Sequence, residues 1–224
     1  MPRPSRRLVN DFTYHVLNRG NGKKRVFYKH QDFLSFIELV KEAKKRLPIN
    51  VFAYCLMPNH FHFVLKSSQA SNLSKWMHWL LTVHSRRYHH YYQTSGHIWQ
   101  GRFRSFMIQN DEHLITVLRY VEGNAVRAGL VFSAKDWPWS SHKQRITEEA
   151  ERIIDTLPVE LPSDWTSYVD KPLTSKELLG LRQSVNHQFP YGDIKWKKKI
   201  SQQLGLAYTF KPRGRPRKDS LKLQ

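Results

Sequence analysis

The sequence predicts an α+β fold in which helices pack on one antiparallel sheet. Two observations carry this prediction. Segments rich in β-forming residues alternate with segments of helical periodicity through the first half of the chain. Two of the β-rich segments also follow one another across the turn Met57-Pro58-Asn59, which is typical of an antiparallel hairpin. With 224 residues, 40% of them hydrophobic, the chain can bury a sizeable core without disulfides.

The first two elements are a strand and a helix. Residues 12–18 read as a strand that ends at a Gly-Asn-Gly turn. From Phe33 to Leu47, apolar residues recur at helical spacing until Pro48 ends the pattern, so an amphipathic helix is expected to cover the sheet.

The later elements follow from the same two periodicities. We expect strands at 51–56, 60–65 and 98–108, and helices at 71–93 and 111–129. The resulting order is strand, helix, two strands, helix, strand, which is close to the split βαβ arrangement of a ferredoxin-like sheet. Beyond Val131 the signals weaken, and we expect only a C-terminal extension with short helices and a basic tail.

Charge sets the class of partner. The chain has 37 Lys and Arg against 18 Asp and Glu, a net charge of +19, so a nucleic acid is the default partner. The single cysteine, Cys55, excludes a disulfide framework and a multi-cysteine zinc site. The sequence shows neither an apolar run of membrane-spanning length nor a signal peptide, and we expect a cytoplasmic protein with no membrane partner.

His60 and His62 are the first candidate site residues. Side chains alternate between the two faces of a strand, so both imidazoles point the same way while Phe61 points into the opposite layer. Two imidazoles on one face can converge on a divalent ion but do not complete its coordination. The alternative is that two polar residues merely occupy the wet face of a half-buried strand.

Tyr120 and Asn124 could supply the missing groups. They lie four residues apart in a predicted helix, and a phenol and an amide oxygen would therefore face one point. The alternative is a tyrosine at the edge of the core and an asparagine at a helix end.

Four motifs in this order resemble the REP-associated tyrosine transposases, a branch of the single-tyrosine HUH transposases. They are Tyr14-His-Val-Leu-Asn-Arg-Gly20, Met57-Pro-Asn-His-Phe-His-Phe-Val64, Trp99-Gln-Gly-Arg-Phe103 and Arg119-Tyr-Val-Glu-Gly-Asn-Ala-Val-Arg-Ala-Gly-Leu130. The resemblance implies that His60, His62 and Asn124 are metal ligands and that Tyr120 is the nucleophile. Ala125 departs from the pattern, because such proteins often have proline there.

The resemblance also implies an activity. The expected protein is a metal-dependent transposase that cleaves and rejoins single-stranded hairpin DNA of the REP type through a 5′-phosphotyrosine, working as a monomer associated with the bacterial nucleoid. Mg²⁺ or Mn²⁺ would be the cofactor, with Mn²⁺ a serious competitor because two ligands are imidazoles. Two alternatives stay open: a rolling-circle replication initiator or relaxase, and a DNA-binding regulator in which the metal site is idle.

Further residues are expected to contact DNA because basic side chains are interleaved with aromatic and amide ones. Ser85-Arg86-Arg87-Tyr88 is one such segment, and the predicted contacts are Asn18, Arg19, Gln100, Arg102, Arg104, Arg127, Arg213 and Arg215. Asn18 and Arg19 would read a guide sequence at the foot of the hairpin. Trp99 and Phe103 either stack on bases or belong to the core.

These expectations divide the chain into three parts. Residues 1–142 form the catalytic domain and 143–210 the C-terminal extension. Residues 211–224 form a basic tail whose Arg213-Gly-Arg-Pro216 core resembles an AT-hook, in which arginines follow a narrow minor groove. The alternative for the tail is a plain basic segment.

Overall fold

A computed structural model describes residues 8–147 and 152–206. It contains one four-stranded sheet in which every neighbouring pair of strands is antiparallel, in the order β2-β3-β1-β4. The strands are β1 (Thr13–Arg19), β2 (Asn50–Met57), β3 (His60–Lys66) and β4 (Arg104–Ile108). The predicted α+β, ferredoxin-like class is therefore confirmed.

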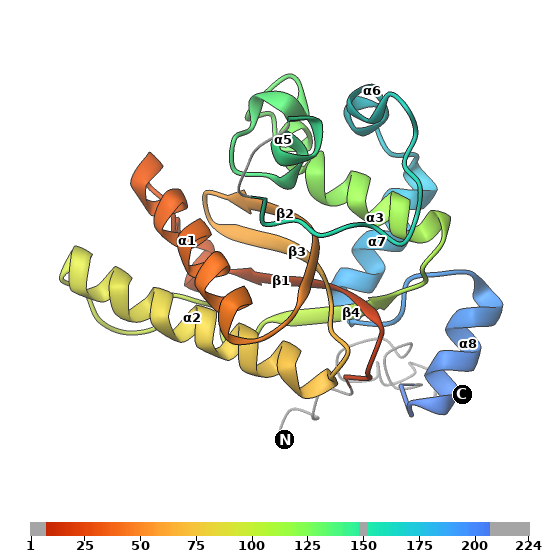
Figure 1. The fold of residues 1–224 in the computed structure, drawn as a ribbon, viewed down its shortest axis with the longest axis horizontal. Helices are drawn as coiled ribbons and strands as arrows, with labels where there is room; N and C mark the ends of the chain where they lie inside the picture. The colour runs from red at the N-terminus through yellow and green to blue at the C-terminus, as the bar shows by residue number, and fades with distance from the viewer. Residues whose placement is uncertain (1–7, 148–151, 207–224) are drawn as a thin grey trace, which may run out of the picture.

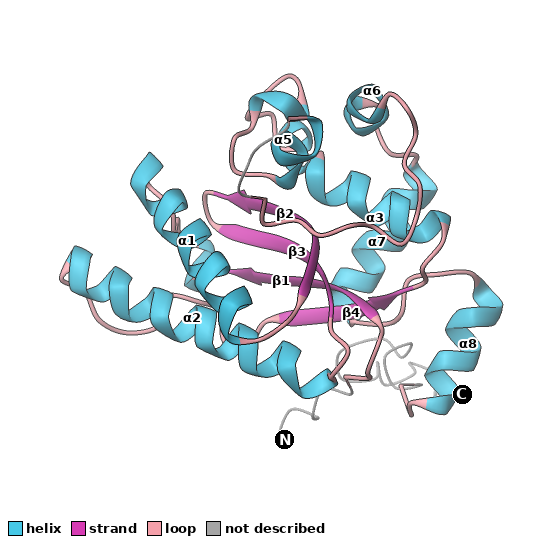
Figure 2. Ribbon diagram, in the orientation of Figure 1, coloured by secondary structure: helices cyan, strands magenta, loops and turns pink. Residues whose placement is uncertain are grey.

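Helices lie on both faces of the sheet (Figure 1, Figure 2). They are α1 (His30–Arg46), α2 (Ala70–Tyr92), α3 (Glu112–Glu122), α4 (Asn124–Arg127), α5 (Ser141–Ile146), α6 (Trp165–Asp170), α7 (Ser175–His187) and α8 (Ile194–Gln203). The pair α1 and α2 covers one face, and α3 packs on the other with α6 and α7 beside it. None of the described helices is long and apolar enough to span a membrane.

Strand β3 divides its side chains between these two layers. Phe61, Phe63 and Leu65 belong to the core under α1 and α2, whereas Val64 belongs to the core under α3. Because strand side chains alternate, His60 and His62 share the face of Val64. The predicted alternation is confirmed, and both imidazoles lie on the face covered by α3.

Two predicted elements are shorter than expected. The strand predicted at 98–108 is regular only in β4, because residues 98–103 form a loop that turns over the end of β1; there the Gln100 amide donates to the Arg19 carbonyl at 2.8 Å. The helix predicted at 111–129 breaks at Gly123 into α3 and α4. A Cβ at Gly123 would lie 3.0 Å from the Arg119 carbonyl oxygen and 3.2 Å from that of Val169, so the close approach of α6 leaves little room for a larger residue at the break.

The segments after residue 142 pack into the two cores. Ile153 and Ile200 are buried under α1 and α2, while Trp165, Val169 and Leu181 are buried around α3. The C-terminal extension therefore holds the layer that carries Tyr120 against the sheet.

Candidate functional site

The two histidines of β3 form the floor of the candidate site. Their ring centroids lie 5.0 Å apart with the ring planes nearly perpendicular. His62 is buried, with 4% of its surface exposed, and His60 is half-buried at the open end of the strand. Strand pairing places Arg19 directly opposite His60 on β1, so a guanidinium belongs to the same end of the sheet.

Helix α3 brings Tyr120 to this floor. Its apolar side, with Leu114, Val117, Leu118 and Val121, is buried against the sheet. Tyr120 lies on the flank of that side, and its ring centroid is 5.8 Å from that of His62, with perpendicular planes. The structure therefore places a phenol next to the imidazole pair within one chain.

Asn124 begins α4, immediately after the break at Gly123. Only 9% of its surface is exposed, and its amide nitrogen has no hydrogen-bond partner among the described residues. Helix α4 packs on β2, the strand whose Cys55 pairs directly with His62 of β3. Asn124 therefore belongs to an element that lies next to the strand pair carrying the two histidines.

Burial, aided by neighbouring positive charges, lowers the pKa of both imidazoles and keeps them neutral. Burial, followed by the charge of Arg19, lowers the pKa of His60 to about 4. Burial is also the main cause that lowers the pKa of His62, with further contributions from His15, His60 and Arg127. A neutral imidazole is the form that binds a metal ion, and neighbouring arginines favour an anionic substrate such as a phosphodiester.

Arg127 lies against the tyrosine. Its guanidinium carbon is 4.1 Å from the centroid of the Tyr120 ring, and it donates a hydrogen bond to the Tyr120 backbone carbonyl. A cation on the ring face is attracted by the ring and holds it in place. Arg127 can therefore orient the Tyr120 ring and offset the charge of a phosphate.

His15 is a member of the cluster that sequence reasoning missed. Its Nε2 lies 2.9 Å from Nδ1 of His62, the two rings stack with centroids 5.0 Å apart, and His15 is fully buried. Its Nδ1 has no hydrogen-bond partner among the described residues. The alternation of side chains in the first predicted strand places His15 on one face with Leu17. Local periodicity does not show that this strand pairs with β3, which is what brings His15 to His62.

The other predicted DNA contacts separate into two groups. Arg19 and Arg127 lie at the histidine cluster, and Arg104 is half-buried at the start of β4, paired with Leu17. Gln100 and Arg102 are exposed on the loop between α2 and β4.

Asn18 and Trp99 have structural roles beside that loop. Asn18 is buried, and its amide donates to the Gly101 carbonyl at 3.1 Å, so that side chain holds the loop. Trp99 and Phe103 are 6% and 5% exposed and belong to the core, which favours the core alternative for both. Arg213 and Arg215 lie outside the described residues.

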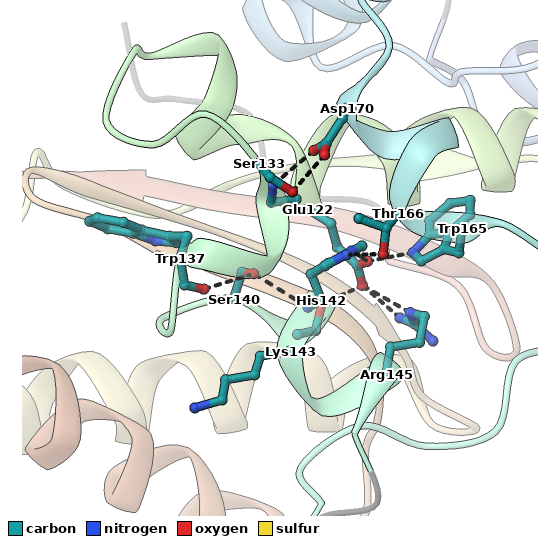
Figure 3. Close-up of polar contacts among 12 residues, drawn as sticks. Glu122, Ser133, Trp137, Ser140, His142, Lys143, Arg145, Trp165, Thr166 and Asp170 are labelled. Atoms are coloured by element: carbon teal, nitrogen blue, oxygen red, sulfur yellow. Dashed lines mark hydrogen bonds and ion pairs between the residues drawn. The ribbon is translucent and has the colours of Figure 1, made fainter.

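A second feature that the sequence analysis did not predict is the environment of Glu122, two residues after Tyr120. The Glu122 carboxylate is completely buried and is bound by groups from α5 and α6 (Figure 3). The partners are Ser141 Oγ at 2.6 Å, Trp165 Nε1 at 2.7 Å, Arg145 Nη2 at 2.8 Å and His142 Nδ1 at 3.1 Å. Arg145 also donates to the Phe52 carbonyl of β2. This cluster fixes the C-terminal end of α3, and hence Tyr120, relative to the sheet.

One further group of metal-ligand types is Asp111, Glu112 and His113, whose ligand atoms lie within 4.8 Å of one another. Asp111 already caps α3, because its carboxylate accepts from the His113 N–H at 2.9 Å and lies 2.8 Å from His113 Nδ1. The group sits at the beginning of α3, whereas Tyr120 is near its end. It is explained as a helix cap and is separate from the histidine cluster.

Comparisons with known proteins agree with this geometry. The model of the family described as "Transposase IS200 like" matches residues 8–124, more than half of the chain. A Haemophilus influenzae protein named as a REP-associated tyrosine transposase is 28% identical over 141 residues, covering 58% of this chain and 74% of the relative. The solved structure of a REP-associated tyrosine transposase bound to a REP hairpin shares the fold. It superposes with a TM-score of 0.56 and 18% identity, over 78% of this chain and all of that one. The chain belongs to the IS200-like transposase family.

Proposed function

We propose that this transposase cleaves and rejoins single-stranded hairpin DNA of the REP type through a covalent 5′-phosphotyrosine at Tyr120. The observation that carries the proposal is the position of the phenol, 5.8 Å between ring centroids from a buried, neutral His62. The named relatives, one of them bound to a REP hairpin, support the choice of DNA.

The residues present fit a divalent ion. His60 and His62 offer neutral imidazole nitrogens, and Asn124, which is 9% exposed, offers a side-chain amide oxygen. This donor set carries no charge of its own, and its nitrogen content suits Mn²⁺ better than Mg²⁺. When bound there, the ion would polarise the scissile phosphate.

The chain's own residues account for the remaining steps. The Tyr120 oxygen attacks phosphorus, forming an O–P bond while the bond to the 3′ oxygen breaks and that oxygen leaves as a 3′-hydroxyl. Arg127 and Arg19 offset the negative charge of the phosphate. A 3′-hydroxyl can later attack the same phosphorus and release Tyr120, which rejoins the strand without an external energy source.

We propose a monomer with the three-part organisation predicted above. In its support, Tyr120 and His62 of one chain already lie together, and Arg145 of the extension binds Glu122 of the helix that carries Tyr120. Residues 1–142 would carry the chemistry, 143–210 would hold α3 in place, and the tail at 211–224, outside the described residues, would add contacts to duplex DNA.

A labelled hairpin oligonucleotide incubated with the protein and Mn²⁺ tests the proposal on a denaturing gel. Wild type should yield a slowly migrating protein–DNA adduct, and Tyr120→Phe should yield none. Tyr28→Phe is the matched control, because Tyr28 is exposed on the other side of the sheet, and it should behave as wild type. An undiminished adduct with Tyr120→Phe would show that the nucleophile lies elsewhere.

A further inference from the structure

A groove of about 680 Å³ lies on the opposite side of the sheet from Tyr120, between α2 and the loop that leads to β4. Apolar side chains of both elements line it, among them Met77 and Leu81 from α2 and Ile98, Trp99 and Phe103 from the loop. Its size is within the range of sites that take small organic groups. It plays no part in the chemistry proposed for Tyr120.

The groove joins two segments that the sequence singles out for DNA contact. Arg86 comes from Ser85-Arg86-Arg87-Tyr88 and Arg102 from the loop, and both line the same groove. His78, His89 and His97 line it as well, whereas no carboxylate of residues 8–147 or 152–206 does. A rim of this charge favours an anionic occupant over an apolar peptide.

Hydrogen bonds within the protein hold the walls of the groove in place before a ligand binds. His89 of α2 lies 2.9 Å from Thr94 Oγ1 through Nδ1 and 2.9 Å from the Gly96 carbonyl oxygen through Nε2. At the other end of the loop, the Asn18 amide donates to the Gly101 carbonyl at 3.1 Å. A site held at both ends loses little conformational entropy when a ligand binds.

The same loop connects the groove to the histidine cluster. The Asn21 amide donates to the Ile98 carbonyl at 2.8 Å and the Gln100 amide donates to the Arg19 carbonyl at 2.8 Å, and Arg19 pairs with His60 on β3. The end of β1 therefore contacts both the loop that lines the groove and the strand that carries His60.

We propose that this groove binds an unpaired nucleotide of the DNA strand. Its base would lie on the apolar floor, and its phosphates would contact Arg86 and Arg102. A duplex would contact this surface only through its phosphates, and the apolar floor would stay exposed to water. An unpaired base can instead stack on the apolar floor and bury it. The proposal rests on the proposed function in that it takes DNA as the ligand.

Binding of three hairpins to the full chain tests the proposal, with Tyr120→Phe as the background so that no strand is cut. One hairpin is blunt, and the other two carry an unpaired thymidine extension at the 5′ or the 3′ end. Fluorescence anisotropy at several salt concentrations gives the affinities. Arg86→Ala should weaken binding of at least one extended hairpin about tenfold and reduce its salt slope by about 0.7, with the blunt hairpin unchanged.

Two further variants make the test specific. Thr82→Trp, which fills the middle of the groove without changing charge, should produce the same selective loss. Lys45→Ala is the control, because it also removes one positive charge but lies exposed on α1, outside the groove lining, and it should bind all three hairpins as the background does. Thermal melting should show all variants folded.

Two outcomes would overturn the proposal: an equal loss for blunt and extended hairpins, or no loss for either extended hairpin. Failure of wild type to form a covalent adduct would instead refute the proposed chemistry, because this binding experiment requires no cleavage.

Discussion

Nε2 of His15 lies 2.9 Å from Nδ1 of His62 within a buried pair of stacked rings. Only one of these two nitrogens can carry the shared proton when both rings are neutral. If Nδ1 of His62 donates, Nε2 of His62 keeps its lone pair for a ligand; if Nε2 of His15 donates, Nε2 of His62 carries a proton and cannot bind an ion. At the proposed metal site, His15 would act as a positioning residue for His62 when it accepts this proton, as hydrogen-bond partners of metal-bound histidines commonly do.

Replacing His15 is expected to weaken ion binding. His15→Phe removes the acceptor for His62 Nδ1, and we expect Mn²⁺ affinity to fall by about 10- to 100-fold. His15→Gln, whose side-chain oxygen can still accept, should retain more of it. Electron paramagnetic resonance of Mn²⁺ titrated into the full chain with hairpin DNA measures the affinity.

His84→Phe is the control for this experiment. His84 is likewise buried, with 6% of its surface exposed, but it packs against Phe27 and Phe36 on the other side of the sheet. If His84→Phe and His15→Phe weaken Mn²⁺ binding equally, the effect of His15 is general to the core and its positioning role is wrong.

Removal of Arg127 is expected to slow cleavage. Arg127→Ala takes away the guanidinium 4.1 Å from the Tyr120 ring centroid, and loss of one charge-stabilising donor typically costs about 10²- to 10³-fold in rate. Single-turnover formation of the covalent adduct gives the rate. Lys45→Ala, which removes one exposed positive charge from α1, should leave that rate unchanged, and an Arg127→Ala rate equal to wild type would remove Arg127 from the mechanism.

Neutralising Glu122 is expected to destabilise the fold. Glu122→Gln leaves the Arg145 guanidinium, bound to Glu122 at 2.8 Å, without its carboxylate partner. Breaking a buried pair typically costs roughly 3–5 kcal/mol. Urea unfolding measures the loss, and Glu42→Gln at the exposed pair should cost at most about 1 kcal/mol. Similar losses for the two variants would show that the buried cluster does not hold α3.

The same carboxylate predicts a dependence of stability on pH. Burial by itself raises the pKa of Glu122, but Arg145 and His142 outweigh burial and hold it at about 2, below the ordinary value of 4.5. The folded state therefore binds fewer protons than the unfolded state between these values, so this contribution is present above pH 4.5 and is lost as the pH falls toward 2. Urea unfolding of wild type across this window should show the decline, and Glu122→Gln should show a smaller one. Parallel curves for the two proteins would contradict the assignment.

Local patterns were sufficient for the main helices and strands, which follow from helical spacing and from β-rich segments. They were also sufficient for the shared face of His60 and His62, because side chains alternate along a strand. They were insufficient where distant segments meet. The Val169 carbonyl of α6 comes close to Gly123, where the helix breaks, and the loop at 98–103 makes backbone hydrogen bonds to Arg19 and Asn21. His15 became a site residue only through the pairing of β1 with β3, which no local periodicity encodes.

Mass spectrometry of the covalent adduct tests the central claim most directly. Digestion with trypsin, which cuts after Arg119 and Arg127, releases Tyr120 in the peptide 120–127. After nuclease treatment, this peptide from wild type should carry a nucleotide linked through its 5′ phosphate to Tyr120. A nucleotide on another tyrosine, or cleaved DNA with no modified peptide, would contradict the account.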